Sequence, residues 1–435
     1  MILLFNEKTV VILSFFVVYL IHKTIKMRVF KLRTLLICTV LFNISCGKAQ
    51  ERHLMIKKET KQIEESIIIG KKIKVNSKIL NQEKEIYLSL PHKYEEHIQC
   101  YPVVFVLEAE FLFEPTKAIS SFLAARSKMP EAIIVGIPND FHEQRHELGF
   151  KKWKGKPEEY LNFFRKELIP FIESNYRADS HRTIIAMSPT NGFLFEAFLN
   201  QPDVFNAYIA LTMHWDWNPE NNEVTMVDHI IKTISNHSYP KSSIYIGTAD
   251  DDMVYSGEEY LTSRKKLDEF QKSKSQVKYK VELLENEEHY SMALVGLRNA
   301  FKFMYPNEEW KFQRLQKMKD PVKQIKDYYD SLSKKYGFDI YPLEDTHGKY
   351  GIVSQAENMI KWKMWDNEKI IAFIKLGLQY YPNSANLHMK LAKVYRKAGY
   401  KKESIETVER AIQLVSKYHP SKLKEYQNEL SKLKE

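Results

Sequence analysis

The sequence predicts an α/β protein, with a doubly wound and mostly parallel sheet followed by a small all-α region. Between residues 66 and 305, continuous apolar runs alternate with helical patterns. Strands buried on both faces of a parallel sheet have this apolar composition, and the alternation itself is typical of a doubly wound fold. After residue 306 the strand patterns stop while helical patterns continue, which predicts a second domain over residues 306–435.

The expected elements follow in chain order. The apolar and β-branched runs predict strands at residues 66–80 (two strands around a turn), 85–90, 102–107, 132–137, 183–187, 207–211, 243–247 and 277–283. Helical periodicity predicts helices at residues 115–127, 157–176, 191–200, 256–272 and 291–304.

The C-terminal region carries a pattern similar to a tetratricopeptide repeat over residues 383–414. The matching positions are Pro382, Leu387, Leu391, Ala392, Tyr395, Gly399, Tyr400 and Ala411. Residues 356–381 form a weaker partner. Because a free-standing solenoid needs about three repeats, we expect a helical bundle packed on the α/β domain. Binding of a protein partner by this helical tail is the alternative.

The N-terminal residues 1–49 have the composition of an export leader, and residues 50–65 that of a polar linker. A basic segment after Met27 precedes an apolar run at residues 34–44 and then Ser45-Cys46-Gly47, which resembles a bacterial lipoprotein signal except at Asn43. Cys46 is therefore the expected lipidation site, and the translation start is expected at Met27. The alternatives are ordinary cleavage near Ala49 or an N-terminal membrane helix. We expect an extracytoplasmic protein, periplasmic or membrane-anchored, with secretion as the second choice.

Charge and cysteine content exclude two other classes. The 435 residues carry a net charge of +10, but residues 1–45 hold half of it, with six basic residues and one acid. No basic run with interleaved aromatic residues stands out, so nucleic acid is not an expected partner. With 3 cysteines, the chain is not a disulfide scaffold.

Three segments carry the residues of a serine hydrolase. Ser188 follows an apolar strand and precedes a helix, where a nucleophile elbow belongs. His289 follows the last strand, the usual position of a triad histidine. The acid comes from Asp250, Asp251 or Asp252, which lie between the two along the chain, and this order is that of α/β-hydrolases.

Residues 66–305 resemble the putative-esterase family of α/β-hydrolases, which includes ferric-siderophore esterases and esterase D-like enzymes. The similar segments are YPVVFVLEAE (101–110), MPEAIIVGIPN (129–139), RHEL (145–148), FRKELIPFI (164–172), NYR (175–177), NQPDVFNAYIA (200–210) and HYSM (289–292). The helical tail resembles the extension of some extracytoplasmic bacterial members. The resemblance implies Ser188 as nucleophile, His289 as base and Asp250 as acid, with Asp252 and Asp251 as alternates.

The elbow departs from that family, which has GHSxGG where this chain has AMSPTN. Pro189 is the sharpest departure, because the residue after the nucleophile normally donates its N–H to the oxyanion hole and proline has none. Losing one such donor costs about 100- to 1000-fold in turnover. Glu108 and Ala109 lie near the expected second donor. Thr190 or Asn191 is expected to replace the missing donor by its side chain.

Two functions remain open from the sequence. The first is an exported serine esterase acting on a small-molecule ester, impaired by Pro189. The alternative is a catalytically degenerate esterase-like protein that binds a ligand or partner. Arg145 is a candidate for an anionic substrate group, and Trp215 for a cleft wall or a core position. No phosphate loop or zinc motif occurs, so neither cofactor nor metal is expected.

Overall fold

Residues 68–435 form one compact unit. The structure, a computed structural model, describes residues 66–139, 146–151, 154–213, 215, 225–235, 242–271, 277–311, 315–345 and 351–434. The predicted leader, Cys46 and Arg145 lie outside these residues. None of the described helices is both long and apolar enough to cross a membrane.

In the part of the chain that the structure describes, eight strands form one sheet in the order β1-β2-β4-β3-β5-β6-β7-β8. The strands are β1 (Lys71–Ser77), β2 (Gln82–Ser89), β3 (Tyr101–Leu107), β4 (Ile133–Ile137), β5 (Ala178–Met187), β6 (Ala207–Leu211), β7 (Ser243–Ala249) and β8 (Lys278–Leu284). Only β1–β2 and β2–β4 pair antiparallel, and every other pair is parallel. The expected strand pair in residues 66–80 is wrong: the segment holds one strand, which turns back at residues 78–81 to pair with β2.

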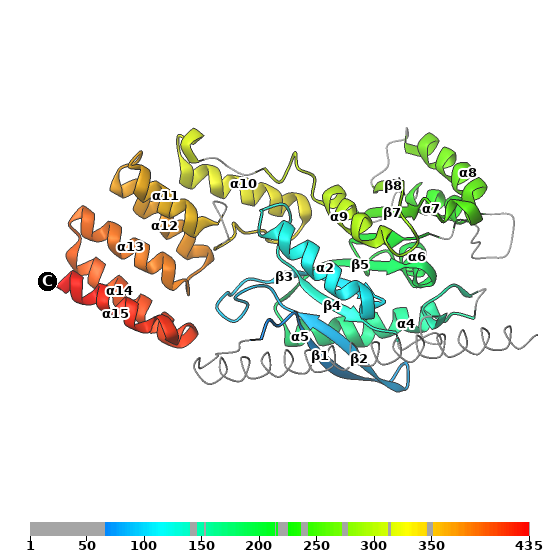
Figure 1. The fold of residues 1–435 in the computed structure, drawn as a ribbon, viewed down its shortest axis with the longest axis horizontal. Coiled ribbons are helices and arrows are strands. Elements are labelled where there is room, and N and C mark those ends of the chain that lie inside the picture. Colours follow the sequence, from blue (N-terminus) through cyan, green and yellow to red (C-terminus); the bar gives the residue numbers. More distant parts are fainter. Residues whose placement is uncertain are drawn as a thin grey trace, which may run out of the picture. The chain divides into compact units, whose positions relative to one another are not determined.

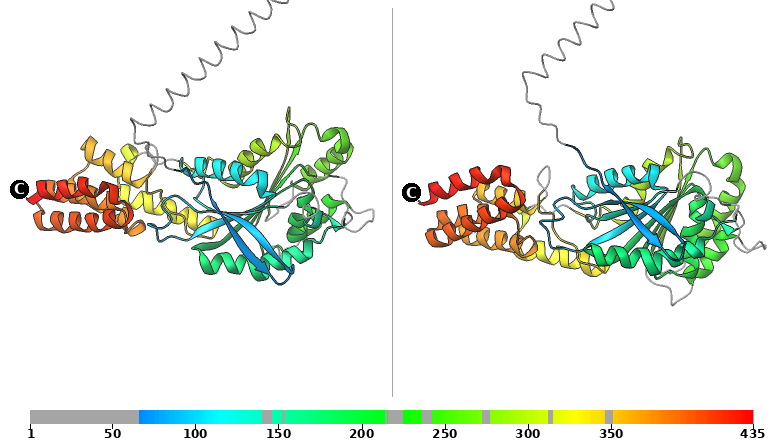
Figure 2. Two further views of the ribbon diagram at one scale, coloured as in Figure 1. Left: turned by 60° about the horizontal axis from the view of Figure 1, so that its bottom comes forward. Right: turned by 90° about the horizontal axis from the view of Figure 1, so that it is seen from below.

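Helices cover both faces of the sheet (Figure 2). One face is covered by α2 (Ala109–Ala124) and α9 (Met292–Met304), and the other by α4 (Pro157–Phe163), η2 (Phe164–Leu168), α5 (Ile169–Asn175), α6 (Asn191–Asn200), α7 (Met226–Ser235) and α8 (Met253–Gln271). The inner strands β3, β4 and β6 are buried at every position. This burial explains why their sequences are continuously apolar instead of alternating. With the helices on both faces, the sheet is the doubly wound α/β-hydrolase architecture.

The C-terminal region is entirely helical over its described residues. It contains α10 (Pro321–Tyr336), α11 (Ile352–Trp362), α12 (Asn367–Tyr380), α13 (Ala385–Ala398), α14 (Lys401–Tyr418) and α15 (Leu423–Lys434). From α11 to α15 each helix packs against the next, as Figure 1 shows. The turn between α13 and α14 is made by Gly399, whose φ of 89° is a conformation that glycine adopts without strain. Whether these hairpins are tetratricopeptide repeats stays a prediction, as do the domain boundaries.

One hydrophobic core joins the helical region to the sheet. The cluster that contains α2 and α9 continues through Trp310 into α10 and on to Leu387 and Val394 of α13. The helical region therefore packs on the α/β part, as the sequence suggests, and the two share a continuous apolar interior.

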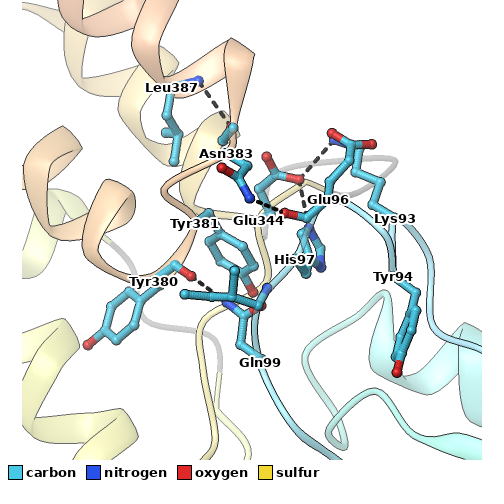
Figure 3. A network of polar contacts seen from close by, with 12 residues as sticks. Lys93, Tyr94, Glu96, His97, Gln99, Glu344, Tyr380, Tyr381, Asn383 and Leu387 are labelled. Atoms are coloured by element: carbon cyan, nitrogen blue, oxygen red, sulfur yellow. Dashed lines mark hydrogen bonds and ion pairs between the residues drawn. The ribbon is translucent and has the colours of Figure 1, made fainter. Parts of the chain in front are cut away.

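A polar network accompanies this shared core (Figure 3). The carboxylate of Glu344, which follows α10, is 2.8 Å from Lys93 Nζ and 3.1 Å from His97 Nε2, both in the loop after β2. Nearby, Asn383 Nδ2 donates to the carbonyl of Glu96 at 3.0 Å. The Glu344 side chain is only 3% exposed. Buried charges persist only when they are paired, so this network fixes the helical region to the loop before β3.

Candidate active site

The turn at the end of β5 holds Ser188 in a strained conformation. Its φ is 55°, in the left-handed region that costs a non-glycine residue about 1–3 kcal/mol. A short 3₁₀ helix, η3 (Ser188–Thr190), follows and leads directly into α6. This sharp strand–turn–helix geometry is that of a nucleophile elbow, which places the hydroxyl at the carboxyl end of the sheet.

A hydrogen-bonded chain of three side chains starts at Ser188. His289 Nε2 lies 3.1 Å from Ser188 Oγ, and His289 Nδ1 lies 2.7 Å from Asp252 Oδ1. A carboxylate only accepts hydrogen bonds, so the Nδ1 proton donates to Asp252, and Nε2 is then the acceptor for the Ser188 hydroxyl. The arrangement is that of a general base poised on a serine hydroxyl.

The carboxylate in this series of hydrogen bonds is that of Asp252. This corrects the expectation of Asp250. All three aspartates occupy the turn between β7 and α8. The turn leaves Asp250 and Asp251 exposed, and Asp250 Oδ2 accepts the Asn286 backbone N–H at 3.4 Å. The third aspartate, with a side chain only 17% exposed, is the one that the turn directs at the imidazole.

Thr190 replaces the second glycine of the family motif by making hydrogen bonds of its own. Its Oγ1 accepts the Met187 N–H at 3.1 Å and lies 2.9 Å from the Met187 carbonyl and 3.2 Å from Glu108 Oε1. The side chain is fully buried, so this β-branched residue is accommodated by ties to the end of β5 and to the turn after β3.

Neither Thr190 nor Asn191 has a side-chain donor left for an oxyanion, so that expectation is wrong. The single hydroxyl proton of Thr190 is used within the elbow. The amide of Asn191 donates to the carbonyls of Leu211 at 2.8 Å and Thr212 at 3.4 Å. Both groups hold the elbow to neighbouring strand ends.

The turn after β3 lies beside the elbow because β3 and β5 are parallel neighbours. Glu108 turns the chain with a φ of 54°, and α2 then begins at Ala109. The Glu108 side chain is fully buried and reaches Thr190. The first backbone N–H groups of a helix have no intrahelical acceptor. Those of Ala109 and Glu110 therefore have no acceptor within α2 and lie in the turn whose Glu108 reaches the elbow, where Pro189 offers no N–H.

A close backbone approach behind the elbow was not predicted from the sequence. A Cβ at Gly192 in α6 would lie 2.3 Å from the carbonyl carbon of Gly149, and Phe193 N donates to the Leu148 carbonyl at 2.8 Å. Only glycine permits this contact. Gly192 thus takes the close-packing role that the family motif gives to the glycine two positions earlier.

Trp215 is a core residue and not a cleft wall. It is 2% exposed, its indole N–H donates to Thr248 Oγ1 at 2.8 Å, and its ring packs edge-on against Tyr260. A buried tryptophan usually pairs its N–H in this way. The aromatic pair exposed beside the site is instead Phe111 and Tyr290, with ring centroids 6.4 Å apart and Tyr290 adjacent to His289.

No group of three His, Cys, Asp or Glu side chains suited to a metal ion occurs among the described residues.

The parallel sheet, the elbow after a central strand and the chain order Ser188, Asp252, His289 define an α/β-hydrolase. Comparison with known families narrows the class. Residues 77–293 match the family described as "Putative esterase", and this part of the chain belongs to that family.

Individual relatives are distant. Ferri-bacillibactin esterase BesA of Bacillus subtilis is 26% identical over 167 residues, which cover 32% of this chain and 56% of that protein. The chain thus spans little more than half the length of this relative.

Two solved structures share the fold. An IroE-like serine hydrolase from Shewanella oneidensis has a TM-score of 0.58 at 19% identity, covering 72% of this chain and 99% of that one. An uncharacterised protein from Capnocytophaga ochracea has a TM-score of 0.52 at 17% identity, covering 82% of this chain and 99% of that one. That share exceeds residues 77–293, so the likeness in fold reaches into the C-terminal helices.

Proposed function

We propose that this protein is a serine esterase in which Ser188, His289 and Asp252 form the catalytic triad. The observation that carries the proposal is the pair of hydrogen bonds, 3.1 Å from Ser188 to His289 and 2.7 Å from His289 to Asp252. Membership of an esterase family supports it independently.

In the proposed reaction, Ser188 Oγ attacks the ester carbonyl carbon while His289 Nε2 accepts the hydroxyl proton. Asp252 stabilises the imidazolium that forms. The proton then passes from His289 to the departing alcohol oxygen as the acyl–oxygen bond breaks. A water molecule hydrolyses the acyl-serine by the same steps, and the serine regains its proton.

The oxyanion needs backbone donors, and we assign this role to the N–H groups of Ala109 and Glu110. The N-terminus of α2 adds the positive end of its helix dipole. Because Pro189 has no N–H, the oxyanion hole receives its backbone donors from the start of α2 alone. We expect turnover below that of relatives with an N–H at this position, by as much as the 100- to 1000-fold that one donor contributes.

The direct test is release of p-nitrophenol from a p-nitrophenyl ester, with wild type and Ser188→Ala compared over short and aromatic acyl groups. We expect a burst that matches the enzyme concentration in the wild type and none in Ser188→Ala. Ser180→Ala, on an exposed position of the same strand, is the control and should behave as wild type.

The alternative, an esterase-like protein that binds without turnover, is favoured by one feature, the missing donor at Pro189. The same experiment separates the two. If no acyl group gives release that depends on Ser188, the hydrolase proposal is wrong and the binding function remains.

We propose small-molecule esters as substrates. The curated relative is, by its name, an esterase of ferri-bacillibactin. The exposed rings of Phe111 and Tyr290, set edge to face beside His289, offer apolar contacts to an aromatic acyl group. Hydrolysis of p-nitrophenyl benzoate, compared with that of p-nitrophenyl cyclohexanecarboxylate, tests the preference for an aromatic acyl group. Equal rates would contradict it.

We also propose that the protein is exported and anchored through a lipid on Cys46. The support is the basic and apolar order of residues 27–49. In a bacterial host, a clickable palmitate analogue should label the wild type and Cys38→Ala but not Cys46→Ala. Labelling that survives Cys46→Ala would exclude the anchor.

A further inference from the structure

A cavity lies at the amino edge of the sheet, opposite the edge that carries Ser188. Its volume is about 470 Å³, within the range of about 300–1,000 Å³ typical of small-molecule pockets. Glu131 and Ala132 in its wall immediately precede β4, and His97 lies just before β3. These are the amino ends of parallel strands whose carboxyl ends face the elbow. The cavity is therefore separate from the esterase site.

One wall of the cavity is already neutralised within the protein. Glu344 pairs with Lys93 and His97 (Figure 3). His97 Nδ1 lies 3.2 Å from the Tyr101 hydroxyl. Burial alone would raise the pKa of Glu344, but the hydrogen bond from His97 and the charge of Lys93 outweigh it and lower the pKa to about 2. The charges of this wall are therefore paired within the protein and are not available to bind a ligand.

The remaining walls carry the opposite charges of Lys117 and Glu131, which do not pair with each other, and a further carboxylate, that of Asp345. Lys117, from α2, donates to the carbonyl of Leu90 at 3.2 Å, and Glu131 lies before β4. Among the described residues, no ion pair joins these two half-buried side chains. Burial lowers the pKa of Lys117 and raises that of Glu131, and the charge of each partly opposes the shift of the other. Both would gain from a partner of opposite charge.

We propose that this cavity binds a small zwitterion of amino-acid size, with its carboxylate on Lys117 and its ammonium on Glu131. One such ligand satisfies both charges at once, whereas an anion or a cation alone leaves one of them without compensation. Phe122, Ala124, Ala125 and Leu343 supply the apolar part of the lining, which an apolar side chain of the ligand would cover.

The experiment is calorimetric titration of the full chain with L-leucine and L-phenylalanine. Two analogues of leucine serve as ligand controls: 4-methylpentanoate lacks the ammonium, and 3-methylbutylamine lacks the carboxylate. We expect saturable binding of at least one amino acid, and binding at least about ten-fold weaker for each analogue of leucine, because a charge-assisted hydrogen bond is lost.

Protein variants locate the site. Lys117→Met and Glu131→Gln should each weaken binding by about ten-fold or more. Lys128→Met is the matched control, because Lys128 is also a half-buried lysine donating to a carbonyl, that of Trp310, but does not line the cavity. Each variant is first checked for an unchanged melting temperature, and Lys117→Ala and Glu131→Ala replace any variant that fails to fold.

Four results would overturn the proposal: no saturable binding of either amino acid, equal binding of a singly charged analogue, unchanged binding by both cavity variants, or an equal loss in Lys128→Met. Release of p-nitrophenol by the same variants is expected to be unchanged, so a failed esterase proposal and a failed binding proposal give different results.

Discussion

The carboxyl edge and the amino edge of the central sheet differ in how their residues are held in place. At the carboxyl edge, three described non-glycine residues that follow the neighbouring strands β3, β5 and β6 have left-handed φ angles: Glu108 at 54°, Ser188 at 55° and Thr212 at 48°. At the amino edge, Glu344, Lys93 and His97 form a buried network of paired charges. Lys93 in this network also has a left-handed φ, of 54°, so backbone strain occurs at both edges. What distinguishes the amino edge is the pairing of buried charges, which holds two regions together. The difference separates the residues that should affect turnover from those that should affect stability.

The largest effect should come from the acid at the carboxyl edge. Asp252→Asn removes the acceptor that fixes the His289 tautomer and should lower kcat for ester hydrolysis by about 10⁴-fold with little change in melting temperature. Asp250→Asn is the control and should stay close to wild type, because Asp250 bonds only weakly to the Asn286 backbone. If Asp250→Asn were the more damaging change, the turn would present a different acid from the one described.

At the amino edge, Glu344→Gln should act on stability and not on kcat. Removing one partner from a buried pair leaves Lys93 uncompensated, so the free energy of unfolding should fall by about 3–5 kcal/mol in urea titration. Glu357→Gln, which breaks an exposed pair with Lys390, should cost less than about 1 kcal/mol. Equal losses in the two variants would remove the distinction between a buried and an exposed pair.

Glu344 also makes the free energy of unfolding depend on pH. The folded pKa of Glu344 is about 2, below its usual value of 4.5. A lowered carboxyl pKa contributes stability that is fully present above pH 4.5 and is lost as the pH falls through 2. Wild type should therefore lose more stability over this interval than Glu344→Gln, measured by urea titrations at each pH. Parallel losses in both proteins would contradict this assignment.

Pro189 allows the missing donor to be restored. Pro189→Ala gives the residue after the nucleophile its N–H, and we expect kcat to rise by about 10- to 100-fold, since one oxyanion donor is worth up to about 1000-fold. Pro202→Ala, in the turn after α6, should leave kcat unchanged. An unchanged kcat in Pro189→Ala would mean that the oxyanion is already fully satisfied from α2.

The smallest effect tests whether Thr190 supports the strained elbow. Thr190→Val keeps the shape but leaves the Met187 N–H without its side-chain acceptor, which should lower the free energy of unfolding by about 1 kcal/mol. Thr407→Val, at a half-buried position of α14, should change it by less than about 0.5 kcal/mol. An unchanged free energy of unfolding in Thr190→Val would show that the elbow does not depend on this hydrogen bond.

Most of the fold could be predicted from the sequence pattern, because a strand that is buried on both faces has a continuously apolar sequence. The runs at 102–107, 132–137 and 207–211 are continuously apolar since both faces are covered, and each is a strand within one residue of its expected limits. Residues 66–80 misled because Ile67, Ile68 and Ile69 are exposed in the structure. Composition alone does not distinguish an exposed apolar segment from a strand.

The site was harder to predict because its geometry depends on turns. Three successive aspartates are equivalent in sequence, and only the path of the turn after β7 decides that Asp252 meets His289. The side chain of Thr190 or Asn191 was expected to donate to the oxyanion. Instead, Thr190 Oγ1 lies 3.2 Å from Glu108 Oε1 and Asn191 donates to the carbonyl of Leu211, and both partners are distant in sequence. The charge network around Glu344 had no local signal at all, since its partners lie some 250 positions earlier in the chain.

The apolar interior shared by the sheet and the C-terminal helices limits how the polypeptide can be shortened. Trp310, Ile325 and Leu332 bury their side chains in the same cluster as α2 and α9. A protein cut after residue 305 would expose the apolar residues of this cluster to water. Large exposed apolar patches lead to aggregation. The helical region is thus part of what keeps the esterase-like part soluble, and a protease that removes it would inactivate the molecule without touching Ser188.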